Sequence, residues 1–159
     1  METPVVPTAS PATLPELATY LEPFAPLFRR STSRESLERY VTGLLTDLPH
    51  KNCDTIAAAV AGTSTERLQY LLTDAVWEPQ ALDQQRVRAL VAHSRWPIEQ
   101  FYEDAKDACG LDHYQGRRWD GLHRHLALVM LAYSFLARQR WRPAMSAGVS
   151  PSGERPSFL

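Results

Sequence analysis

Apolar residues recur at intervals of three or four positions after Thr32, which predicts an amphipathic helix with one side in the core. These apolar positions are Leu37, Tyr40, Val41, Leu44 and Leu45. The segment Thr32-Ser-Arg-Glu35 has the form of a capping box, whose side chains bond the free N–H groups at a helix start. Pro49 is expected to close this helix, because proline cannot continue it.

Two further helices are expected to begin at prolines, which suit the first turn because they lack an N–H donor. One runs from Pro15 towards Leu21, and another starts at Pro79. The apolar side of the second is formed by Leu82, Val87, Leu90 and Val91. Arg86 and Arg88 are expected on its exposed side.

A pair of short helices is predicted between Asp54 and Thr73. Asp54 is a candidate cap for the first helix, Gly62 turns the chain, and Thr63-Ser-Thr-Glu66 resembles a second capping box. Helix, glycine turn and helix form the arrangement of a DNA-binding helix-turn-helix, and an ordinary helical hairpin fits the same pattern. In the first interpretation the second helix exposes side chains that can reach bases or phosphates: Thr65, Arg67 and Gln69.

The last third predicts two more helices. One follows Pro97 and ends at Gly110, and the other runs from Trp119 to Arg138 with apolar residues nearly all round, as in a buried helix. No stretch shows the alternation of apolar and polar residues that indicates β-strands. We therefore expect an all-α fold, an irregular bundle of about six or seven helices.

Composition is typical of one soluble domain. The chain has 159 residues and a net charge of −1, so no global positive charge indicates nucleic-acid binding. Cys53 and Cys109 are its two cysteines, too few for a zinc site or a disulfide framework. The most apolar segment, Leu126 to Leu136, is too short to span a bilayer, and the N-terminus does not resemble a signal peptide. We expect a cytoplasmic protein without a membrane partner.

Four charged residues lie close to one stripe of the helix after Pro97: Arg95, Glu99, Glu103 and Lys106. A carboxylate flanked by basic side chains is a candidate metal ligand or general base. A solvated row of ion pairs has the same spacing, so the spacing leaves both interpretations open.

Three residues separate Arg95 from Glu99 and six separate Glu99 from Lys106, which resembles a transposase signature. Bacterial insertion-sequence transposases of the Asp-Asp-Glu type carry it as a Tyr-Arg-Glu-Lys motif. Three longer strings are similar to the two ends of that family: Phe24-Ala-Pro-Leu-Phe28, Leu71-Leu-Thr-Asp-Ala-Val-Trp77 and Gly110-Leu-Asp-His-Tyr-Gln-Gly-Arg-Arg-Trp119. The resemblance implies that Glu99 corresponds to the third acidic metal ligand, with Arg95 and Lys106 as its catalytic neighbours.

Two departures from the family argue against catalysis. The tyrosine of the motif falls on Ala92. Family members are also far longer, and their two catalytic aspartates lie on a ribonuclease-H-like sheet that this chain does not supply. The chain resembles two transposase ends joined across an internal deletion near Leu90 to Arg95. Intact members use Mg²⁺, whereas no cofactor and no strand cleavage are expected here, so Glu99 would be a vestigial ligand.

The expected organisation has four parts. They are a disordered tail at 1–14, a helical transposase N-terminal region at 15–92, the C-terminal glutamate helix and apolar helix at 93–142, and a disordered tail at 143–159.

The resemblance implies a transposase-like protein that binds DNA, such as transposon ends, without cutting it. From Arg117 to Arg142 six arginines accompany one acid, Asp120, which favours contacts with phosphates. The expected DNA-binding arginines in this segment are Arg117, Arg118 and Arg124. Two alternatives stay open: a module whose helix Leu122 to Leu136 joins a second copy or an intact transposase, and an inert relic.

Overall fold

The computed structural model describes residues 15–91 and 105–146, and these residues form an irregular all-α bundle. They contain no β-strand, so the predicted fold class is confirmed for this part of the chain. Residues 1–14 and 147–159 of the two predicted tails lie outside the described ranges, whereas residues 143–146, predicted to be disordered, continue the last long helix. No helix among the described residues is long and apolar enough to cross a membrane.

Seven elements have defined bounds, and a further helical turn occupies residues 105–109. They are α1 (Pro15–Leu21), the 3-10 helix η1 (Glu22–Leu27), α2 (Ser31–Leu45), α3 (Cys53–Ala59), α4 (Thr65–Thr73), α5 (Pro79–Val91) and α7 (Trp119–Ser146).

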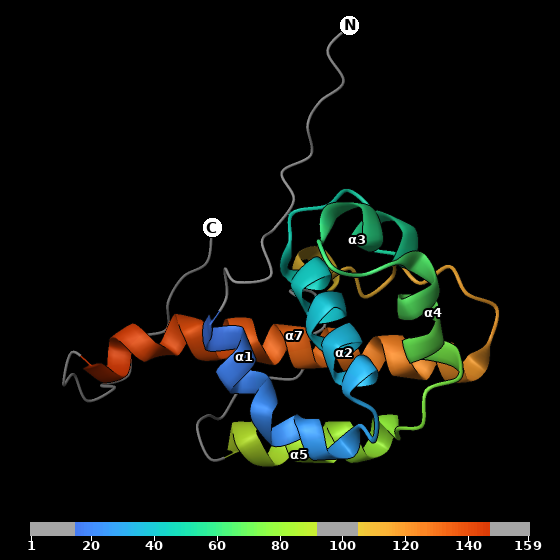
Figure 1. The fold of residues 1–159 in the computed structure, drawn as a ribbon. Helices are drawn as coiled ribbons and strands as arrows, with labels where there is room; N and C mark the ends of the chain where they lie inside the picture. The colour runs from blue at the N-terminus through green and yellow to red at the C-terminus, as the bar shows by residue number, and fades with distance from the viewer. Residues whose placement is uncertain (1–14, 92–104, 147–159) are drawn as a thin grey trace, which may run out of the picture.

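The long helix α7 is the element on which the others are assembled (Figure 1). Helices α2, α4 and α5 each pack directly against it, and α3 bridges α2 and α4. Helix α1 and η1 connect α2 with α5. The arrangement places both ends of α7 at the periphery and its middle in the core.

The middle of α7 is buried on most sides. Its fully or nearly buried residues are Ala127, Leu128, Val129, Leu131, Ala132, Tyr133, Ser134 and Phe135. Leaving these apolar residues in water would destabilise the folded protein by roughly 25 cal/mol per Å² of exposed apolar surface, so a helix that is apolar nearly all round must be covered. The helices of the first half cover it, which confirms its predicted burial and leaves those residues unavailable to another molecule.

Helix α2 presents its predicted apolar side to this core. Leu37, Tyr40, Val41 and Leu44 are 2% exposed or less. The predicted capping box at Thr32 is wrong, because α2 begins at Ser31 and Arg30 precedes it without a side-chain cap. Arg34 fixes the approach to the helix instead: its Nε donates to the carbonyl of Phe28 at 3.0 Å and to that of Ala25 at 3.1 Å.

The caps of the two short helices also differ by one or two residues from the prediction. Asn52, not Asp54, caps α3, because its Oδ1 accepts from the N–H of Thr55 while the Thr55 hydroxyl accepts from the N–H of Asn52. Ser64, not Thr63, caps α4. Each error comes from choosing among adjacent polar residues that can all cap a helix.

On helix α5 two side chains have the opposite burial to the one predicted. Arg86 is buried, and its guanidinium bonds the Asp83 carboxylate at 2.6 Å and the Ser134 hydroxyl on α7 at 3.2 Å. Val87 is 40% exposed instead. A buried arginine is tolerated here because acceptors from two helices surround it.

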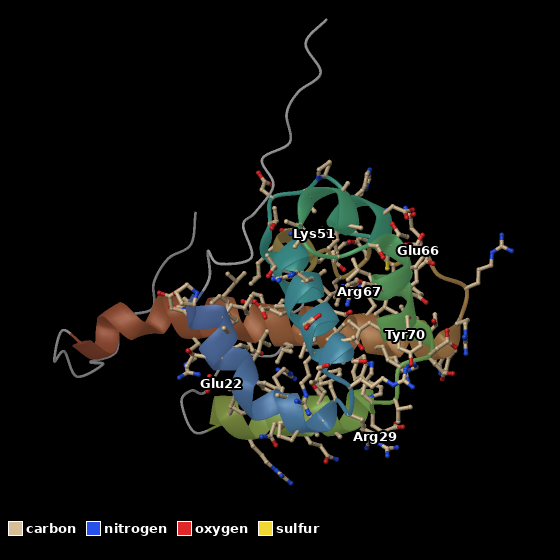
Figure 2. The ribbon with its side chains drawn as sticks, in the orientation of Figure 1. Glu22, Arg29, Lys51, Glu66, Arg67 and Tyr70 are labelled. Carbon is tan, nitrogen blue, oxygen red and sulfur yellow. The ribbon has the colours of Figure 1, made fainter. Side chains whose placement is uncertain are left out.

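A buried ammonium group joins two helix ends. Lys51 is 5% exposed, and its Nζ donates to the carbonyl of Leu44 at 2.6 Å and to that of Ala108 at 2.5 Å (Figure 2). Both carbonyls belong to last helical turns, which lack intrahelical N–H partners and carry partial negative charge. Burial lowers the pKa of Lys51 from its ordinary value, since desolvation penalises the charged form.

A buried histidine extends this junction to α7. Nε2 of His125 lies 3.2 Å from the carbonyl of Gly110, so it must carry the proton. Nδ1 is then free to accept from the Tyr40 hydroxyl at 2.7 Å. Gly110 ends the helical turn with φ +68°, the C′ conformation predicted for it. Helices α2 and α7 and residues 105–118 therefore meet in one polar junction, which we define by Tyr40, Lys51, Gly110 and His125.

Substitution of Lys51 by methionine should destabilise the fold. It leaves the carbonyls of Leu44 and Ala108 without their shared donor, at a cost of about 2–4 kcal/mol in the free energy of unfolding. Lys106→Met is the matched control. The Lys106 side chain is 54% exposed and its ion pair with Asp112, at 3.8 Å, is weak, so this substitution should change the free energy of unfolding by less than about 0.5 kcal/mol. Urea unfolding followed by circular dichroism measures both variants, and equal midpoints for them would refute the role of Lys51.

Stability should fall in mild acid because of His125. Burial lowers its pKa to about 4, so the unfolded chain, with a pKa of 6.5, binds more protons between these values. The contribution of His125 is therefore fully present above pH 6.5 and is lost as the pH falls towards 4, with about 1.5 kcal/mol lost from pH 6.5 to 5. In His125→Gln this component is missing, so the stabilities of the variant and the native protein should converge on acidification. Parallel pH profiles would contradict the assignment.

Candidate nucleic-acid interface

Helices α3 and α4 form the predicted pair of short helices, an arrangement that a helix-turn-helix and an ordinary helical hairpin share. Gly62 turns the chain between them with φ +80°, a backbone conformation that residues other than glycine rarely adopt. Ile56 of α3 and Leu68 and Leu71 of α4 are fully buried, and they bring the two helices together. The opposite side of α4 is therefore left to solvent.

The exposed side of α4 is polar. Glu66, Arg67, Gln69 and Tyr70 are exposed, and Thr65 is half-buried in the first turn. Two of the three residues predicted for this surface, Arg67 and Gln69, thus point outward. Tyr70 was not predicted, although it follows Gln69 directly and its ring is 36% exposed.

The first turn of α2 lies beside α4. Arg67 is 3.5 Å from the Glu35 carboxylate, and Nη1 of Arg30 donates to the Tyr70 hydroxyl at 3.2 Å. Figure 2 shows Arg67 and Tyr70 on the side of α4 next to α2. Arg30 could not be assigned to this surface from sequence, because it is 40 residues from Tyr70 in the chain.

The segment before α7 reaches the other end of α4. Arg117 and Arg118 are exposed, and Nη1 of Arg118 lies 3.4 Å from the carboxylate of Asp74. The Thr73 hydroxyl, which donates to Asp74 at 2.7 Å, and Arg118 lower the pKa of that carboxyl. We call the combined surface the α4 surface, formed by Arg30, Arg67, Gln69, Tyr70, Arg117 and Arg118.

Arg124, predicted to contact DNA, has a structural position instead. Its two terminal nitrogens donate to the carbonyls of Leu72 at 3.3 Å and Trp77 at 3.2 Å. Its guanidinium also lies 5.3 Å from the centre of the Trp77 ring. These contacts tie α7 to the end of α4, so Arg124 does not belong to the α4 surface.

The transposase signature falls mostly outside the described residues. Arg95 and Glu99 lie there, so the structure gives no position for either. Lys106 is exposed and 3.8 Å from Asp112. Within the described ranges no three His, Cys, Asp or Glu side chains come together as metal ligands.

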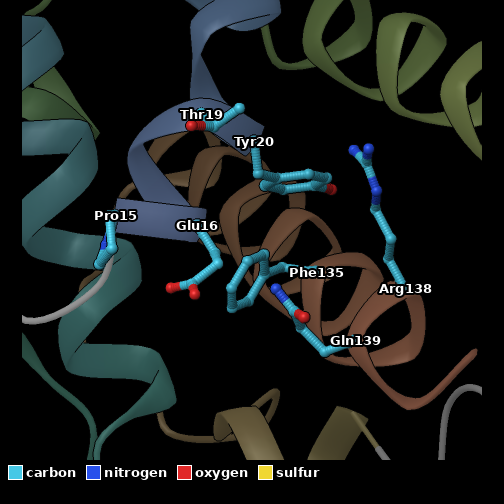
Figure 3. A pocket seen from close by; sticks show the side chains of 7 residues that line it. All are labelled: Pro15, Glu16, Thr19, Tyr20, Phe135, Arg138 and Gln139. Atoms are coloured by element: carbon cyan, nitrogen blue, oxygen red, sulfur yellow. The ribbon is translucent and has the colours of Figure 1, made fainter. Parts of the chain in front are cut away.

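A cavity of about 210 Å³ lies between α1 and α7 (Figure 3). Tyr20 and Phe135 form its apolar part, while Glu16 and Arg138 line it with opposite charges. The Tyr20 hydroxyl donates to the Leu131 carbonyl at 3.2 Å, and burial raises the pKa of Tyr20. The cavity has one carboxylate among its lining residues, so it does not present the acid pair that phosphoryl transfer uses.

One comparison with known proteins gives a match. A model of the family described as "Transposase DDE domain" matches residues 40–135, which extend from Tyr40 in α2 to Phe135 in α7. Neither the curated proteins nor the solved structures give a match.

Proposed function

The chain belongs to the transposase DDE domain family, and we propose that it binds DNA through the α4 surface without cutting it. The observation that carries this proposal is the exposed polar side of α4, flanked by arginines from two other segments. Because α3 and the core cover the opposite side of α4, its polar side is the one open to a partner.

Charge supports DNA as that partner. Four arginines of the α4 surface come from three separate segments: Arg30, Arg67, Arg117 and Arg118. Nearby acids partly neutralise them, since Glu35 pairs with Arg67, Asp74 pairs with Arg118, and Glu66 is exposed on the same side of α4. Exposed ion pairs of this kind are weak because water screens them, so phosphates can replace these carboxylates as partners.

The size and chemistry of α4 fit a major groove. With its side chains an α-helix is about 10–12 Å across, which matches the width of the major groove, about 12 Å. Gln69 can pair with the edge of an adenine and Arg67 with that of a guanine. Terminal repeats of an insertion sequence are the expected target, so the chain would compete with an intact transposase for element ends.

Absence of cleavage follows from the acids that the chain lacks. Two-metal phosphoryl transfer needs several carboxylates that converge from separate segments, and only Glu99 matches a ligand position of the family. An internal deletion near Leu90 to Arg95 accounts for the other two. The packing of α7 on the N-terminal helices supports this, because α7 then needs no sheet to cover its apolar residues.

The same packing weakens the alternative of an oligomerisation module. That alternative depended on an exposed apolar side between Leu122 and Leu136. The residues at its centre are buried within the chain, so they do not offer a surface to a second copy.

Binding to a labelled terminal-repeat duplex should be tighter than to a random duplex and should weaken as salt rises. Arg67→Gln should lower the affinity about threefold to tenfold and reduce the salt slope by about one. Asp74→Asn should raise the affinity, because it removes a negative charge and frees Arg118. Fluorescence anisotropy titrations at several salt concentrations measure the affinities of the native protein and of both variants.

Arg88→Gln on α5 is the matched control, since this exposed arginine lies outside the α4 surface and its loss should leave the affinity unchanged. Equal effects of the Arg67 and Arg88 substitutions would show that binding reflects charge alone. Equal affinity for repeat and random duplexes would refute recognition of element ends.

Purified protein should not nick or join DNA. A supercoiled plasmid that carries element ends, incubated with Mg²⁺ or Mn²⁺, should keep its topology in an agarose gel, because a single family carboxylate does not hold a metal pair. Glu99→Ala is the control. A Mn²⁺-dependent product that the native protein forms and this variant does not would overturn the prediction.

A further inference from the structure

Trp119 is an exposed aromatic residue at the start of α7. It is 72% exposed, more than Tyr70, Val76 or Val87, the other large apolar residues exposed in the described part of the chain. An indole exposed to this extent offers a flat apolar face that a partner from outside the chain can cover. Trp77, in contrast, is 3% exposed and belongs to the core.

The surroundings hold Trp119 in a defined position. The ring of His123 lies edge-on to it at 4.5 Å, and Nδ1 of His123 is 3.0 Å from the Trp119 carbonyl. The Tyr114 hydroxyl donates to the carbonyl of Arg118 at 3.2 Å and so fixes the residue before it. Gly121 permits this contact, since a Cβ there would lie 2.1 Å from the Tyr114 oxygen. An indole held in this way loses little entropy on binding.

Charged residues of both signs lie beside Trp119. Arg117 and Arg118 precede it and are exposed, and His123 contacts it. Asp120 is the acid next to it in the chain. Asp74 pairs with Arg118, at 3.4 Å. An exposed ring beside two guanidinium groups matches the two parts of a nucleotide, a flat base and a phosphate.

We propose that Trp119 stacks on an unpaired base of bound DNA while Arg117 and Arg118 contact the adjacent phosphates. This inference rests on the proposed DNA binding and adds the form of DNA preferred. A base inside a duplex has both faces covered by its neighbours, whereas a base in a single-stranded tail offers a free face to the indole. The α4 surface then holds the duplex, and Trp119 holds a single strand where it leaves that duplex. Arg118 belongs to both regions and connects them.

Stacking can be separated from phosphate contacts with two tails. One labelled duplex carries a tail of three unpaired nucleotides, and its partner carries a tail of three abasic sites with the same phosphates. The native protein should bind the first about tenfold more tightly, because only that tail offers bases to stack. Trp119→Ala should bind the two tails equally, and Trp119→Phe should keep most of the preference because it retains an aromatic ring. Anisotropy titrations of each tailed duplex and of the blunt duplex provide the affinities.

Val87→Ala on α5 is the matched control, since it truncates an exposed apolar side chain away from α7's first turn and should keep the preference. Thermal unfolding should be the same for all variants, since each changes an exposed side chain. Equal binding of both tails by the native protein, or a preference that survives Trp119→Ala, would overturn the stacking role while duplex binding stands. Failure to bind any of the three DNAs would reject the proposed function and the stacking role together.

Discussion

The burial of α7 is the constraint on which the rest of this structure depends. A helix with apolar side chains on nearly every side must be covered, and 28 residues of helix need more than one neighbour. Helices α2, α4 and α5 provide this cover, each with its own apolar stripe. The positions of the other helices follow, because α3 packs on α2 and α4, and α1 with η1 packs on α2 and α5. The described residues thus form a core from helices, with no sheet among them.

Polar contacts then determine how the segments around α7 are aligned. Hydrophobic packing is tolerant of small shifts, whereas hydrogen bonds in a buried site require particular distances and leave a costly unpaired group when they are missed. Lys51 links the ends of two helices, and His125 links α7 to Tyr40 and Gly110. These bonds hold the segment 105–118. The segment ends in Arg117 and Arg118 and leads directly to Trp119, the first residue of α7. The buried junction therefore positions the surface on which we base the function.

The basic residues divide into two groups with different roles. Arg86 and Arg124 are used inside the fold, where they bond acceptors on neighbouring helices. Arg67, Arg117 and Arg118 remain at the surface, so they are the ones that phosphates can reach. Membership of a transposase family agrees with a DNA-binding surface. Under the function we propose, the protein would act by occupying DNA, and its effect would depend on its concentration relative to an intact transposase.

The sequence by itself predicted most of the described helices and indicated the family of this protein. The stripe from Leu37 to Leu44, Pro79 at the start of α5 and Gly110 at a helix end are local signals, since each depends on residues within one or two turns. Only the tertiary structure decided which charged side chains are buried. Arg86 and Arg88 are two residues apart with the same chemistry, yet the first is buried and the second exposed. Lys51 likewise finds its acceptor Ala108 57 residues away. Burial of a charge depends on acceptors brought together by folding, and the order of residues along a chain does not contain that geometry directly.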